Sequence, residues 1–135
     1  MPTFFVFLIS VFSILPNTGN LIIRFDKPVN QGNLLVFVYD KADGFPKNKE
    51  MIYRKEIIKC KQTRQINISK LPFKTYAIVV VHDINDNQKM DRNWVGFPAE
   101  PYAISGTKSF RFGPPLYKDA QFDFKSDKQI IDLSF

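Results

Sequence analysis

The sequence contains few of the residue types from which catalytic and metal sites are most often built. Cys60 is the single cysteine among 135 residues, which excludes an internal disulfide and a zinc site made of cysteines. His82 is the single histidine, and nothing in the sequence supplies an oriented third member for a catalytic triad. The sequence therefore favours a protein without catalytic residues. A small hydrolase that uses His82 and Asp83 is the alternative.

Acidic residues are also in the minority. The chain has 13 Asp and Glu against 19 Lys and Arg, a net charge of +6, which favours weak association with anionic surfaces and is equally explained by solubility. Eight of the basic residues lie between residues 41 and 64, interleaved with Phe45 and Tyr53, as in some nucleic-acid-binding proteins. Three acidic residues interrupt this run, so we interpret it as a solvated strand face and expect no nucleic-acid partner.

Charged residues are absent from the chain before Arg24, and residues 4–15 are almost entirely apolar. An apolar run of this length fits the central region of a signal peptide and is too short for a membrane-spanning helix, which needs about 20 residues. No Lys or Arg precedes the run, so a buried N-terminal helix or strand is the alternative. We expect residues 1–19 to be a signal peptide and residues 20–135 to form the mature domain. The protein would then be secreted, periplasmic or in the cell envelope, without a membrane span.

The remaining sequence shows the patterns of strands and turns and no convincing amphipathic helix. Residues 65–68 alternate between polar and apolar, whereas residues 76–81 form a continuous apolar run that suits a central strand buried on both faces. These patterns predict a single all-β domain, a seven-stranded antiparallel sandwich with a long loop region. The expected strands span residues 21–25, 34–39, 52–58, 65–68, 76–81, 121–124 and 130–135.

Oxygen-bearing side chains at alternate positions follow the most apolar of these strands. Asp83, Asn85, Asn87 and Asp91 have the spacing with which a calcium loop directs side chains toward a common centre. In the alternative interpretation, the same side chains accept hydrogen bonds from neighbouring backbone amides in Asx-turns. The sequence leaves both open, and the first predicts one weakly bound calcium ion.

A long segment between residues 83 and 120 has few strand signals and is rich in aromatic residues and proline. Loops longer than about 12–15 residues are usually functional or disordered, and this composition argues against disorder. In one interpretation the aromatic rings fold into a small satellite core. In the other, Trp94, Tyr102 and Tyr117 form a surface for an unknown extracellular or envelope ligand such as a sugar or peptide.

Several motifs in the same order resemble a known family. Residues 71–76, Leu-Pro-Phe-Lys-Thr-Tyr, are similar to the turn before a central strand in prealbumin-like and carboxypeptidase-regulatory-like sandwiches. They resemble, together with residues 36–40, 44–46, 82–91, 96–98, 102 and 112–120, a secreted bacterial family known as domain of unknown function twenty-one forty-one. The resemblance implies a signal peptide, a compact Ig-like or prealbumin-like β domain and no established activity.

The chain departs from this family where the loop turns. Relatives usually carry glycine at the positions of Asp86 and Gln88, and glycine adopts a positive φ most readily. The twelfth loop position, where an EF-hand has a bidentate Glu, is Trp94, so the loop is not an EF-hand. Glu100 or a backbone carbonyl would have to complete a calcium shell. We therefore expect a binding or structural module, with one calcium ion at the loop of residues 83–91 as an optional stabilising ligand.

Overall fold

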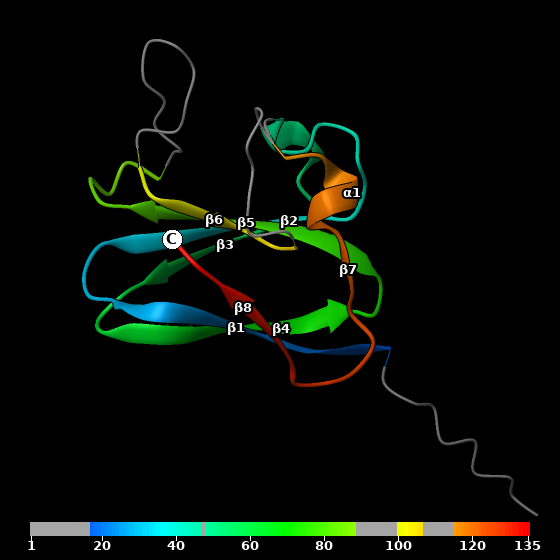
Figure 1. Cartoon of the computed structure of the whole chain (residues 1–135), viewed down its shortest axis with the longest axis horizontal. Helices are drawn as coiled ribbons and strands as arrows, with labels where there is room; N and C mark the ends of the chain where they lie inside the picture. The colour runs from blue at the N-terminus through cyan, green and yellow to red at the C-terminus, as the bar shows by residue number, and fades with distance from the viewer. Residues whose placement is uncertain (1–16, 47, 89–99, 107–114) are drawn as a thin grey trace, which may run out of the picture.

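The computed structural model describes residues 17–46, 48–88, 100–106 and 115–135, which form two β-sheets packed face to face (Figure 1). One sheet has the strand order β4, β1, β8, and the other has the order β3, β2, β5, β6, with β7 paired to β5. The elements are β1 (Thr18–Val29), β2 (Asn33–Tyr39), a 3-10 helix η1 (Lys49–Met51), β3 (Arg54–Lys59), β4 (Thr63–Pro72), β5 (Thr75–Asp83), β6 (Tyr102–Ile104), α1 (Tyr117–Ala120), β7 (Phe122–Asp123) and β8 (Gln129–Leu133).

Alternation of apolar and polar residues builds the three-stranded sheet. In β1, Leu21, Ile23 and Phe25 are buried and the residues between them are more exposed, because successive side chains of a strand point to opposite faces. Strand β4 repeats the pattern with Ile66 and Ile68. These side chains meet the inner faces of β2 and β5 in one hydrophobic core.

The central strands β2 and β5 are buried on both faces, which confirms the prediction made for residues 76–81. Their outer side chains form a second hydrophobic cluster, covered by the β2–β3 connection and α1. Figure 1 shows both of these on the side of the five-stranded sheet that faces away from the other sheet. The second cluster consists of Leu35, Phe37, Tyr39, Val79 and Val81, with Phe45, Ile52, Ile104 and Tyr117 packed against it.

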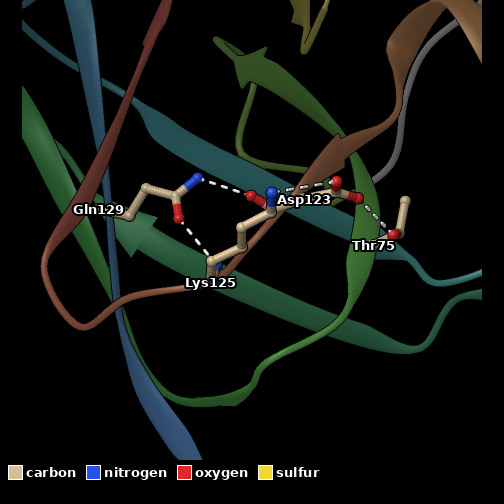
Figure 2. Close-up of polar contacts among 4 residues, drawn as sticks. All are labelled: Thr75, Asp123, Lys125 and Gln129. Carbon is tan, nitrogen blue, oxygen red and sulfur yellow. Dashed lines mark hydrogen bonds and ion pairs between the residues drawn. The ribbon is translucent and has the colours of Figure 1, made fainter.

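Polar contacts fix the passage of the chain from β7 in one layer to β8 in the other (Figure 2). Thr75 Oγ1 donates to Asp123 Oδ1 at 2.7 Å, and Lys125 Nζ lies 3.8 Å from Asp123 Oδ2. Gln129 accepts the backbone N–H of Lys125 at 2.9 Å and donates to the carbonyl of Asp123 at 2.8 Å. After this turn, β8 runs parallel to β1 and completes the three-stranded sheet.

The all-β prediction is confirmed, and the arrangement of the strands differs from the one expected. The described residues contain eight strands, one more than predicted. The additional strand is β6, which the sequence did not predict because three residues are too few to show a periodic pattern. The β1–β8 pair is parallel, since the chain changes layers just before β8. Strand β1 begins at Thr18, two residues before the predicted start of the domain. No helix in the described part of the chain is long and apolar enough to span a membrane.

Candidate functional site

The candidate site lies where β5 ends and the predicted calcium loop begins. His82 and Asp83 are adjacent on the strand, so their side chains point to opposite faces of the sheet. His82 faces the three-stranded sheet, where its Nε2 bonds the carbonyl oxygen of Gln31 at 2.7 Å and its ring lies 6.2 Å from that of Phe135. Asp83 lies on the outer face and is 0% exposed. The structure therefore does not bring together the pair that a hydrolase would use.

The carboxylate of Asp83 organises the loop through its backbone. Oδ2 accepts the N–H of Gln88 at 2.7 Å, and Oδ1 accepts the N–H of Asn87 at 3.3 Å. The side-chain oxygen of Asn85 accepts the same Asn87 N–H at 3.3 Å. These contacts are those of the Asx-turn interpretation. They leave lone pairs on the carboxylate, because an ionised carboxylate has about four acceptor positions.

The loop turns at Asp86 and Gln88. Asp86 has φ +55° and Gln88 has φ +58°, both in the left-handed region that most residues avoid. The side chain of Asp86 also accepts a hydrogen bond from the amide of Asn33, the first residue of β2 after the β1–β2 turn. In that turn a Cβ on Gly32, which has φ +80°, would lie 2.8 Å from the carbonyl oxygen of Asp83. Close contact between the β1–β2 turn and the loop therefore fixes the position of the residues with which the loop begins.

Glu100 supplies a second buried carboxyl group beside the loop. It is 8% exposed, and its Oε1 accepts the N–H of Ile84 at 3.1 Å. Its Oε2 is buried and has no hydrogen-bond partner within the described part of the structure. Glu100 is the residue that the sequence offered as a completing ligand, and the structure places it next to the residue that follows Asp83.

Positive charge near the loop comes from β3. Lys55 Nζ donates to the carbonyl oxygen of Gln88 at 3.4 Å and lies 5.7 Å from the ring centroid of Phe37. The described residues contain no group of three or more His, Cys, Asp or Glu side chains arranged to hold a metal. Any cation here would therefore depend on two carboxylates together with amide or backbone oxygens. The fourth predicted ligand, Asp91, lies outside the described residues.

The three aromatic residues predicted to bind a ligand do not all lie on one exposed surface among the described residues. Tyr102 is 37% exposed on strand β6. Tyr117 packs into the second hydrophobic cluster, with its ring edge-on to Phe45 at 5.8 Å between centroids, and its hydroxyl donates to the carbonyl of Thr75 at 3.3 Å. Burial, followed by the charge of Asp40, raises the pKa of Tyr117. Trp94 lies outside the described residues.

Cys60 has the environment of a structural thiol. It is buried in the main core, and burial raises the pKa of its thiol, which disfavours the nucleophilic thiolate. Sequence reasoning did not identify Gly32 and Asn33 as supports of the loop. They contact a segment about fifty residues later in the chain, and no local pattern records such a contact.

A comparison with known families finds a match that covers most of the chain. Residues 26–132 match the family described as uncharacterized protein conserved in bacteria (DUF2141). No curated protein and no solved structure matches the chain significantly. The matched region contains the whole loop and most of both sheets. Because it covers most of the sequence, the protein belongs to the DUF2141 family of bacterial proteins, as the motifs indicated.

Proposed function

We propose that the protein is a secreted, periplasmic or cell-envelope β-sandwich of the Ig-like or prealbumin-like kind. It serves as a binding or structural module and holds one calcium ion at the loop of residues 83–91. The opposite orientations of His82 and Asp83 support a module over a hydrolase. The two packed sheets support a rigid scaffold that presents its connections at the ends and on one face.

One observation carries the calcium proposal. The carboxylate of Asp83 is fully buried, and its hydrogen bonds come from neutral backbone amides. None of the ion pairs among the described residues includes Asp83. A buried carboxylate is costly unless an opposite charge compensates it. A hard cation that binds several oxygens would supply this charge, and Asn85 and Asn87 provide neutral oxygens in the same loop.

The self-capped loop and the calcium loop make different predictions for stability. In the first, Asp83 acts through hydrogen bonds alone, and stability does not respond to calcium. In the second, calcium binds the folded loop and not the unfolded chain, so it stabilises the protein. With few charged ligands, we expect a dissociation constant of about 0.1–1 mM, the range of extracellular modules. About 10 mM calcium should then add about 1.4–2.7 kcal/mol to the free energy of unfolding.

Thermal unfolding in chelator and in calcium tests the proposal. We expect calcium to raise the Tm of the wild type by roughly 4–10 °C and magnesium at the same concentration to raise it less. Asp83→Asn should remove the increment, because it keeps the shape and deletes the charge. Asp43→Asn, an exposed acid in the β2–β3 connection, is the matched control and should keep it. Identical wild-type melting curves in chelator and calcium would leave the self-capped loop as the correct account.

The start of β1 at Thr18 supports a signal-peptide cleavage site just before this strand. The backbone N–H of Asn20 donates to Asp127 Oδ1 at 2.8 Å, and its carbonyl accepts the N–H of Lys128 at 2.8 Å. Thr18 and Gly19 pair with β4. We therefore expect the mature chain to begin at residue 17 or 18, so that β1 stays whole. Mass spectrometry of protein recovered from the cell envelope measures this, and intact residues 1–15 in the recovered protein would contradict it.

A further inference from the structure

The second buried carboxylate, that of Glu100, has a polar atom without a hydrogen-bond partner. Oε2 of Glu100 is the only buried side-chain oxygen or nitrogen in the described part of the chain that lacks one. Buried polar groups in folded proteins nearly always have a partner, and an exception calls for a bound water, ion or functional role. The residue is more than nine-tenths buried, so bulk water does not solvate this oxygen.

Extending the register of β5 and β6 beyond its last pair sets Glu100 opposite Asp83. Val81 pairs with Tyr102, and the N–H of His82 donates to the carbonyl of Pro101 at 2.8 Å. Continuing this antiparallel register by one residue sets Glu100 across from Asp83. Directly opposed residues of antiparallel strands project their side chains from the same face, with Cβ atoms about 4.5–5.5 Å apart. The contact of Glu100 Oε1 with the N–H of Ile84 agrees with this placement.

Two carboxylates that face each other in a buried position repel. Like charges directly opposite on neighbouring strands destabilise a sheet, and burial strengthens the effect because the local dielectric is low. The backbone N–H groups of Asn87 and Gln88 donate to the carboxylate of Asp83. The N–H of Ile84 donates to Oε1 of Glu100, and Oε2 of Glu100 is left without a partner among the described residues. Lys55, the described cation that contacts the loop, bonds the carbonyl of Gln88.

We propose that Glu100 is a ligand of the calcium ion, together with Asp83, and that the ion joins the end of β5 to the segment that leads into β6. This inference rests on the proposed function of the loop. It adds a ligand from outside the loop, 17 residues beyond Asp83, and makes the site a clamp between two chain segments. Side-chain or backbone oxygens of residues 84–88 complete the shell, because calcium takes 6–8 oxygen ligands.

The effect of Glu100→Gln on stability separates a calcium ligand from a purely structural residue. Glutamine keeps an oxygen for the N–H of Ile84 and removes the charge. In chelator, we expect Glu100→Gln to melt at a higher temperature than the wild type, because it relieves the repulsion with Asp83. In calcium the order should reverse, and the affinity for calcium should fall by about tenfold or more, because affinity follows the number of charged ligands. A structural residue would give Glu100→Gln the same or lower stability under both conditions.

Calorimetric titration with calcium and thermal unfolding of the wild type, Glu100→Gln and the control Glu50→Gln provide the measurements. Glu50 is exposed in the 3-10 helix η1, so its variant should behave as the wild type does. If Glu100→Gln binds calcium as tightly as the wild type, the clamp is wrong and the proposed calcium loop stands. If the wild type does not respond to calcium, both are wrong.

A measurement on the unmodified protein covers the case in which Glu100→Gln does not fold. The chain has three glutamates, Glu50, Glu56 and Glu100, so their side-chain carboxyl carbons give a simple NMR spectrum. Glu56 is paired with Arg54 at 2.5 Å, and Glu50 is exposed, so both serve as internal references. We expect the Glu100 signal alone to shift during the calcium titration. An unmoved Glu100 signal in protein that binds calcium would overturn the clamp.

Discussion

Replacing Gln88 by glycine should stabilise the protein, because its backbone has a conformation that glycine adopts more easily. Gln88 has φ +58°, and its side chain is exposed. Among the described residues it makes hydrogen bonds through its backbone, with Asp83 and Lys55. The substitution therefore removes no side-chain contact described in the structure. It changes the cost of the left-handed conformation and the entropy of the unfolded chain.

The magnitude follows from these two opposing terms. The left-handed conformation costs an ordinary residue about 1–2 kcal/mol. Glycine loses more backbone entropy on folding, which costs about 0.5–1 kcal/mol. The free energy of unfolding of Gln88→Gly should therefore rise by about 0.5–1 kcal/mol, or by roughly 2–5 °C in Tm.

Urea denaturation in chelator measures the change as a shift of the midpoint at constant slope. Gln88→Ala removes the same side chain but keeps Cβ, so its stability should stay within about 0.5 kcal/mol of the wild type. Gln62→Gly is a matched positive control, because Gln62 has φ +51° in the turn between β3 and β4, away from the calcium loop. If Gln62→Gly is stabilised and Gln88→Gly is no more stable than Gln88→Ala, the loop geometry described above is wrong.

Two further predictions concern packing and charge. Tyr117→Ala should lower the free energy of unfolding by about 2–3 kcal/mol, because the ring packs in the second hydrophobic cluster. Tyr102→Ala should change it by less than about 0.5 kcal/mol, because this side chain is exposed. Equal losses of the two variants in urea denaturation would contradict this prediction. The N–H of Asn20 lowers the pKa of Asp127 below 3.8, so the charged form stabilises the folded state above pH 3.8, and this stabilisation is lost as the pH falls through the lowered pKa. The Tm deficit of Asp127→Ala at neutral pH should therefore disappear in acid, and a deficit that persists at pH 2 would show that the carboxylate does not act through its charge.

Local patterns in the sequence determined the class of the fold and the place of the loop. The alternation of polar and apolar residues at 65–68 predicted a strand with one buried face, and Ile66 and Ile68 are buried, because successive side chains of a strand point to opposite faces. The unbroken run at residues 76–81 records a strand buried on both faces. The oxygen-bearing side chains at alternate positions from Asp83 indicated a loop after this strand, and β5 ends at Asp83. Each of these signals depends on a few consecutive residues.

Tertiary structure alone decided how distant segments meet. The parallel pairing of β8 with β1, the covering of the five-stranded sheet by Phe45 and Tyr117, and the support of the loop by Gly32 all join segments far apart in the sequence. The eighth strand, β6, was not predicted because it has only three residues and no periodic pattern. Its conformation depends on its pairing with β5. The sequence offered Glu100 as a ligand, but only the tertiary structure brings its Oε1 to the N–H of Ile84, the residue after Asp83. Pairing of this kind depends on the whole fold, since the residues that meet share no local period.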